Sequence, residues 1–175
     1  MTHFFHALLI TGFTAFAAVT SPAQARQTAE EPRFEGEHRD WRVFVRGEAA
    51  DRVCYAVSRP TDSRPGSVDH GEVYFLVSSW ASGAASEQPS FLAGYALRPE
   101  SPPEARVGSS RYAMYVSGQE GFIEALSDEA RLVRSMRRGS TMRVEATSQR
   151  GTATAYTFSL LGVTAALNQA ASLCD

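Results

Sequence analysis

One short stretch of the chain gathers side chains that could bind a cation or transfer protons. It is Asp69-His70-Gly71-Glu72, within a polar segment. A hydrolase acting on envelope polymers would need a buried carboxylate or a nucleophile activated by histidine, and Asp69, His70 and Glu72 form the cluster to test for that role. Zinc sites, in contrast, use paired Cys or His at fixed spacing. We therefore interpret the stretch first as a solvated loop and expect no metal ion there.

The sequence lacks the motifs of common catalytic and cofactor sites. It contains no G-x-S-x-G elbow, phosphate-binding loop, dinucleotide glycine fingerprint or H-E-x-x-H. After residue 25 only two histidines remain, His38 and His70, and they are far apart in sequence. We expect a protein that is not an enzyme and has no catalytic residues and no cofactor. A Ser/His/Asp group assembled in space would leave no such motif and stays open.

Two cysteines, Cys54 and Cys174, are present. In an exported chain an even number of cysteines indicates a disulfide, because the bacterial periplasm oxidises thiols. On the chain-entropy model, closing a loop of this length stabilises the fold by ~4–5 kcal/mol. The alternative is a reactive thiol, which needs a histidine or cationic neighbour, and none is close in sequence.

Two further groups of side chains could recognise a ligand. Arg131, Arg134 and Arg138 share one side of a predicted helix, where they could bind an anionic lipid or glycan, or simply complement the helix dipole in solvent. The aromatic residues of the predicted strands could line a glycan or partner face, but we expect them mainly in the core and in cross-strand pairs. They are Trp41, Tyr55, Tyr74, Trp80, Tyr95, Tyr112 and Tyr115.

Most of the elements that position these side chains are predicted to be strands. Asp40–Arg46 and Arg52–Ser58 are expected to form a hairpin in which Cys54 and Ala56 face a C-terminal helix. Glu72–Trp80 is an apolar run typical of a buried central strand. Further strands are expected at Phe91–Leu97, Arg111–Val116, Gly121–Glu124, Thr141–Ser148 and Thr152–Ser159. Pro99, Pro102 and Pro103 argue against regular structure before Val107.

Two helices complete the prediction. Ser127 is expected to cap a helix that ends at Gly139 and has an apolar stripe of Leu132, Val133 and Met136. Val163 to Leu173 has Ala and Leu at helical spacing and carries Cys174 at its end. The expected fold is mainly β: an antiparallel β-sandwich-like domain with one inserted helix and a short C-terminal helix.

The first 25 residues are typical of a signal peptide. Phe4 to Val19 is apolar without Asp, Glu, Lys or Arg, and it leads into Ala23-Gln24-Ala25, so cleavage is expected after Ala25. A retained anchor is the alternative, although a spanning helix needs ~20 apolar residues. Residues 26–39 are predicted to be a flexible lead-in and residues 40–175 one domain.

Composition excludes some classes of partner. All 17 basic residues are arginines, they nearly balance 19 acidic residues, and the net charge is −2. Such a balance gives no support for nucleic acid or an anionic membrane surface as the main partner. We expect no nucleic-acid partner and no integral membrane segment once the leader is removed.

The end of the chain resembles a known family. The run from Tyr156 to Leu167, YTFSLLGVTAAL, is a strand that breaks at Gly162 into an Ala-rich helix, and it is similar to the terminal signature of the invasion-associated locus B family. The Asp40-Trp41 opening and the segment Met142-Arg143-Val144-Glu145-Ala146 agree in order and spacing. The resemblance covers most of residues 40–174. It implies an exported or envelope-associated bacterial protein, named for a link to host-cell invasion, with no established enzymatic activity.

The resemblance also bears on the cysteines. Many members of that family have a cysteine four residues after the opening Trp, where this chain has Val45. The short disulfide of those relatives is therefore not expected, and Cys174 becomes the partner for Cys54.

Three hypotheses for function follow. The leading one is a periplasmic, secreted or outer-membrane-associated binding module that contacts an envelope or host component through loops such as Arg59–His70 and Ser82–Ser90. The second is the hydrolase with a site near Asp69, His70 and Glu72. The third is a structural envelope subunit that associates with itself.

Overall fold

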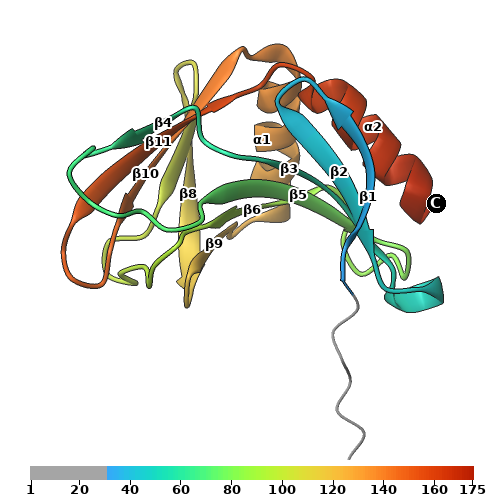
Figure 1. Ribbon diagram of the computed structural model, residues 1–175, viewed down its shortest axis with the longest axis horizontal. Coiled ribbons are helices and arrows are strands. Elements are labelled where there is room, and N and C mark those ends of the chain that lie inside the picture. The colour runs from blue at the N-terminus through green and yellow to red at the C-terminus, as the bar shows by residue number, and fades with distance from the viewer. Residues whose placement is uncertain (1–30) are drawn as a thin grey trace, which may run out of the picture.

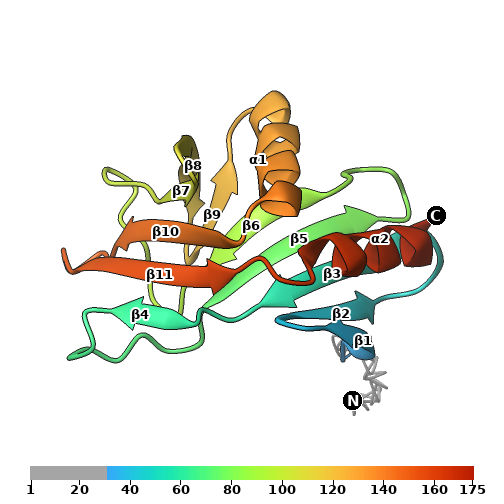
Figure 2. The same ribbon diagram turned by 90° about the horizontal axis from the view of Figure 1, so that it is seen from above.

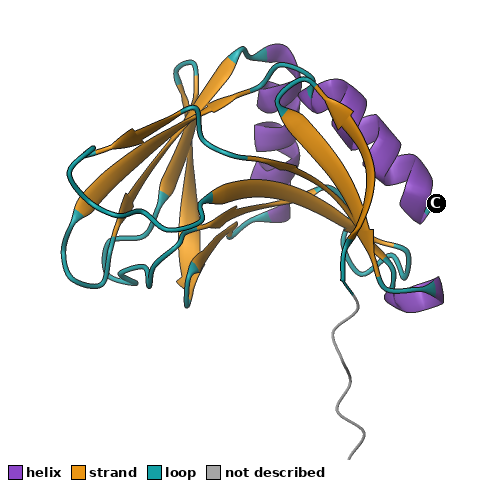
Figure 3. Cartoon of the chain, viewed as in Figure 1, coloured by secondary structure: helices purple, strands orange, loops and turns teal. Residues whose placement is uncertain are grey.

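The structure, a computed structural model, describes residues 31–175. The predicted signal peptide and its cleavage site after Ala25 lie outside the described residues. The predicted fold class is confirmed: the chain is mainly antiparallel β, sandwich-like, with one inserted and one C-terminal helix (Figures 1 and 3). No helix within residues 31–175 has the length and apolar character needed to cross a bilayer.

In the described part, eleven strands form one bent sheet. In chain order they are β1 (Arg33–His38), β2 (Trp41–Arg46), β3 (Val53–Ser58), β4 (Asp62–Arg64), β5 (Tyr74–Trp80), β6 (Gln88–Leu92), β7 (Glu104–Val107), β8 (Ser110–Ser117), β9 (Glu120–Ile123), β10 (Thr141–Thr147) and β11 (Ala153–Ser159). Their order across the sheet is β1-β2-β3-β5-β6-β9-β8-β7-β10-β11-β4, and all neighbours are antiparallel.

Strand β8 divides the sheet into two halves. Its first part, Ser110–Ala113, pairs with β7, and its second part, Met114–Ser117, pairs with β9. We call β1, β2, β3, β5, β6 and β9 the first half-sheet and β7, β10, β11 and β4 the second (Figure 2). The two halves pack face to face, which makes the fold sandwich-like.

Aromatic rings join the two halves in the core. The ring of Phe75 on β5 lies 5.8 Å from that of Phe158 on β11, and the ring of Phe91 on β6 lies 5.5 Å from that of Tyr156 on β11. All four residues are fully buried. Burial of such large side chains supplies much of the hydrophobic stabilisation of a domain of this size.

Both helices lie on the same side of the first half-sheet (Figure 1). Helix α1 (Leu126–Arg138) packs against β6 to β9, and α2 (Val163–Cys174) lies along β3 and β2 (Figure 2). We call the covered side of the first half-sheet its inner face and the opposite side its outer face. Neither helix packs on the outer face.

A disulfide fixes α2 to the sheet. Cys54 on β3 is bonded to Cys174, 120 residues later in sequence, with 5.8 Å between their Cα atoms. This confirms the predicted pair, and Cys54 and Ala56 face the C-terminal helix as expected. The turn into α2 needs glycine, because Gly162 has φ of +92° and a Cβ there would lie 1.9 Å from the carbonyl oxygen of His38.

The lead-in prediction was wrong for its second part. Arg33–His38 form β1, an edge strand paired with β2. Long-range bonds hold it, since Gln169 of α2 bonds His38 at 2.6 Å and donates its side-chain NH₂ to the carbonyl of Glu35 at 3.0 Å. The polar composition of this segment concealed a strand that pairs with the adjacent β2 and bonds to Gln169, more than 100 residues later. The domain therefore begins at β1 and not near Asp40.

Other boundaries also differ from the prediction. The segment after Pro103 forms β7, because Ala105 and Val107 alternate as buried residues and the prolines stop short of them. The expected loop Arg59–His70 contains β4, which pairs with β11. The strand expected at Phe91–Leu97 lies earlier, as β6.

The start of the inserted helix also differs. Helix α1 begins at Leu126 after Ala125, with no side-chain cap bond, so the prediction that Ser127 caps it was wrong. The other features of the helix are as expected. Leu132, Val133 and Met136 are buried, and the helix ends before Gly139.

Candidate functional site

His70 and Glu72 line one small pocket of about 170 Å³, but Asp69 does not, and the three side chains have different hydrogen-bond partners. An oxygen of Asp69 accepts a bond from the backbone N–H of Gly71 at 2.9 Å, which stabilises the local turn. Nδ1 of His70 lies 2.8 Å from the hydroxyl of Tyr156, and Nε2 lies 3.0 Å from the carbonyl oxygen of Pro65. Both ring nitrogens of His70 therefore contact groups of the protein itself.

The side chain of Glu72 has different hydrogen-bond partners from those of Asp69 and His70. Its carboxylate accepts a bond from Arg59 at 2.6 Å and another from the hydroxyl of Tyr74. Arg59 also lies over the Tyr74 ring, at 5.1 Å from its centre. The three side chains form a cross-strand cluster at the surface, in which both Arg59 and Tyr74 donate to the Glu72 carboxylate.

The contact of His70 continues into the core as a chain of hydroxyl groups. Tyr156 donates to the hydroxyl of Tyr95 at 2.9 Å, and Tyr95 lies 2.6 Å from the hydroxyl of Thr154. Burial, together with the bond to Tyr95, raises the pKa of Tyr156 far above that of a free tyrosine. A phenol held in its neutral form is a poor nucleophile, so this chain serves to hold the loop around His70 on β11.

Metal binding finds no support in the side-chain arrangement either. Within residues 31–175, no three His, Cys, Asp or Glu side chains lie close enough together to hold a metal ion.

A more continuous surface lies on the outer face of the first half-sheet. The rings of Phe34, Phe44 and Tyr55 lie side by side on β1, β2 and β3, with 5.6 Å and then 5.7 Å between ring centres. Phe34 is 50% exposed, and the other two are partly exposed. Arg42 covers this row, with its guanidinium 5.0 Å from the Phe34 ring centre and 5.1 Å from that of Phe44.

The apolar surface continues onto the central strands. Val57 on β3 is paired with Leu76 on β5, and Tyr74 on β5 is paired with Leu92 on β6. All four side chains are partly exposed. The sequence predicted a buried central strand here, yet only one face of β5 is buried, because nothing in the described chain covers the other.

These strands form the floor of a groove of about 600 Å³. Its floor is apolar and aromatic, from Tyr55, Val57, Leu76 and Leu92, whereas arginines and acids lie at its edges. Arg39 at the edge, in the β1–β2 turn, has no hydrogen-bond or ionic partner within residues 31–175. The groove is thus a concave apolar surface with polar groups at its rim, the arrangement common in small-molecule sites.

Of the two loops predicted to bind a ligand, only one lies beside the groove. Arg59 and Thr61, at the start of the Arg59–His70 loop, line the groove. The Ser82–Ser90 segment does not reach it. The carboxylate of its Glu87 pairs with Arg137 of α1, and the backbone N–H of Glu87 donates to Ser79 Oγ of β5 at 3.0 Å. That segment is therefore tied to α1 and β5.

Sequence reasoning missed the groove because it assigned the aromatic residues mainly to the core. A signal was present in β3, where Val53, Tyr55 and Val57 alternate with Cys54 and Ala56. Once the cysteine face is assigned to the interior, the opposite face of this strand remains apolar. Comparison of the chain with family models, with curated proteins and with solved structures found no significant match.

Proposed function

We propose that this chain is an exported, non-enzymatic binding module of a bacterial cell envelope and that it holds a small amphipathic ligand in the groove of the outer face. The observation that carries this proposal is that the outer face of the first half-sheet bears a contiguous, partly exposed apolar surface, although its inner face is also apolar. A sheet with one face in solvent normally places polar side chains there. Exposed contiguous apolar surface of this kind marks interaction sites in soluble domains.

The shape and lining of the groove support a small ligand with an apolar body. Its volume of about 600 Å³ falls within the range of roughly 300–1,000 Å³ that is common for small-molecule sites. The floor of Tyr55, Val57, Leu76 and Leu92 suits an acyl chain or a ring system. Arg39, which has no partner in the described chain, suits an anionic head group at the rim.

Export and family are part of the same proposal. The N-terminal sequence is typical of a cleaved leader, and disulfides such as Cys54–Cys174 persist in oxidising compartments. We infer a periplasmic, secreted or outer-membrane-associated protein related to the invasion-associated locus B family, with a role in contact with an envelope or host component. Nothing in the arrangement of Asp69, His70 and Glu72 favours the hydrolase.

The test uses the anionic aromatic probe 1-anilinonaphthalene-8-sulfonate with the oxidised protein. The probe should bind saturably, with a rise in fluorescence. The variant Leu76→Asn, which places an amide in the apolar floor, should bind it about tenfold more weakly, since loss of one buried aliphatic contact costs about 1.5 kcal/mol. Circular dichroism would verify that the variant is folded.

The matched control is Leu126→Asn, because Leu126 is 80% exposed at the start of α1 and far from the groove in the fold. This control should bind the probe like the unchanged protein. Equal affinity of Leu76→Asn and the unchanged protein, or equal losses in the two variants, would refute the groove as the binding site.

A further inference from the structure

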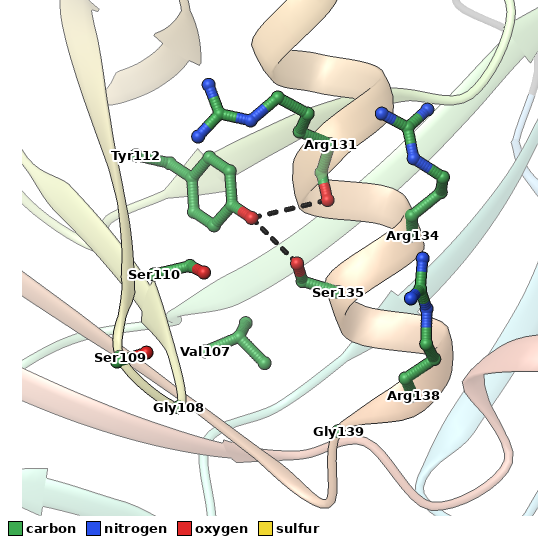
Figure 4. A pocket seen from close by; sticks show the side chains of 10 residues that line it. All are labelled: Val107, Gly108, Ser109, Ser110, Tyr112, Arg131, Arg134, Ser135, Arg138 and Gly139. Atoms are coloured by element: carbon green, nitrogen blue, oxygen red, sulfur yellow. Dashed lines mark hydrogen bonds between the residues drawn. The ribbon is translucent and has the colours of Figure 1, made fainter.

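A second cleft lies between α1 and the turn that joins β7 to β8 (Figure 4). It has a volume of about 480 Å³ and shares no lining residue with the groove of the outer face. We propose that this cleft binds a phosphate group, either as free phosphate or as the head group of an anionic lipid. The proposal is independent of the amphipathic ligand proposed above.

The charge of the cleft is the first argument. Three arginines of α1 line it, Arg131, Arg134 and Arg138, and no acidic residue does. Their spacing of three and four residues places them along one side of the helix. Asp128 lies outside the lining and pairs with Arg131 at 2.5 Å. The cleft therefore keeps an excess of positive charge in a protein whose net charge is −2.

Two of these arginines are unpaired. The side chains of Arg134 and Arg138 have no ionic or hydrogen-bond partner within residues 31–175, whereas the side chain of their neighbour Arg137 bonds to Glu87 and to Asn168. A guanidinium presents its N–H groups in a planar fork that matches two oxygens of a phosphate. Two free forks beside one cleft supply the donors that such an anion needs.

Hydroxyl groups complete the polar lining. Ser109 of the β7–β8 turn and Ser110 at the start of β8 lie across from the helix, and Ser135 lies on the helix between the arginines (Figure 4). The buried Tyr112 fixes this wall, because its hydroxyl lies 2.7 Å from that of Ser135 and donates to the carbonyl of Arg131 at 3.3 Å. The Arg131 guanidinium lies over the Tyr112 ring, 5.6 Å from its centre. Strand and helix are thereby held at a fixed separation.

The helix dipole does not account for this set of arginines. Cations near the end of a helix are favourable, and this explains Arg137 and Arg138 in the last turn. The effect falls off within one turn, so it gives no reason for Arg131 and Arg134. Arg131 is held by Asp128 and the Tyr112 ring, so Arg134 is the arginine for which an anion in the cleft supplies a partner.

The test measures binding of inorganic phosphate by isothermal titration calorimetry, at constant ionic strength set with sodium chloride. The unchanged protein should bind saturably, and the double variant Arg134→Gln/Arg138→Gln should bind at least tenfold more weakly. Arg150→Gln is the matched control, because Arg150 is exposed in the β10–β11 turn and should leave binding unchanged. Thermal melts without phosphate would show that each variant is folded, and the single variants serve if the double variant is not.

A second arm distinguishes the source of the phosphate. Sedimentation with phosphatidylcholine vesicles, with and without phosphatidic acid, tests the lipid head group. Binding that requires phosphatidic acid and is lost in the double variant supports a lipid phosphate, whereas binding of inorganic phosphate alone supports a free ion. No binding in either arm, or binding retained by the double variant, would overturn the proposal. The Leu76→Asn result is separate, so the two proposals can fail independently.

Discussion

Glu129 on α1 is an ionisable residue that the fold buries. Glu129 is only 7% exposed. Burial raises the pKa of this carboxyl above its ordinary value, and a hydrogen bond with Gln88 only partly opposes the effect. A raised pKa in the folded state means that the folded protein favours the protonated carboxyl of Glu129 over its carboxylate.

This residue gives a pH-dependent prediction. The contribution of Glu129 to stability is fully present below the pKa of the unfolded state and is lost as the pH rises through the folded pKa. The variant Glu129→Gln should therefore raise the free energy of unfolding at pH 7, by an amount on the order of 1 kcal/mol, and should have less effect at pH 4. Urea denaturation at the two pH values measures this. The same change at exposed Glu124 should have little effect at either pH.

At the scale of single residues the sequence predicted chemistry poorly. It placed His70 in a solvated loop, but His70 contacts Tyr156, 86 residues away. It grouped Asp69, His70 and Glu72 because they are close in sequence, although the turn at Gly71, where φ is +61°, gives the three side chains different partners. The groups that a side chain contacts depend on the pairing of strands that are far apart in sequence. Residue types and local spacing do not reveal that pairing.

At the scale of elements, the disulfide between β3 and α2 carries the clearest prediction. Replacing both cysteines, Cys54→Ala and Cys174→Ala, should lower the free energy of unfolding by about 2–5 kcal/mol, because the unfolded chain is no longer constrained across 120 residues. Denaturant unfolding of the oxidised and double-variant proteins measures the difference. Addition of a reductant should destabilise only the unchanged protein, and equal sensitivity of both would contradict the assignment.

The elements themselves were predicted well where the pattern is local. The β10–β11 hairpin, the β8–β9 hairpin and the apolar stripe of α1 follow from alternation, turn residues and helical spacing. Of the missed strands, β1 is largely polar, and β4 and β7 have only three and four residues. Two of them, β1 and β4, are edge strands paired on one side only. Strand β4 pairs with the distant β11, and β1 pairs with β2 and is bonded to Gln169 of α2.

At the scale of the whole molecule, contact between the two half-sheets holds the sandwich together. Phe158 is fully buried against Phe75 of the facing half. The variant Phe158→Ala should lower the free energy of unfolding by about 3–5 kcal/mol, through loss of apolar contact and creation of a cavity. Urea denaturation measures the loss. Leu126→Ala, at an exposed position, should change stability by less than about 0.5 kcal/mol, and a similar cost for both would argue against the face-to-face packing.

The sequence predicts the fold class of the domain but not the order in which its strands pair. Many short strands and two helices indicate a β-sandwich-like fold, and the cysteine face of β3 indicates where α2 lies. The division of β8 between β7 and β9, which generates both half-sheets, has no counterpart in the alternation of its residues. The groove on the outer face depends on the pairing of β3, β5 and β6, and of this the sequence showed only the alternation in β3.

The bond between Cys54 and Cys174 also determines what happens when the chain is cut. Nearly every surface loop, including the turn between β5 and β6, lies inside the segment that the bond closes. A protease that cleaves one such loop leaves two pieces that the disulfide still joins covalently. Strands of one piece also remain paired with strands of the other. Release of a fragment then requires a reducing agent as well as a protease.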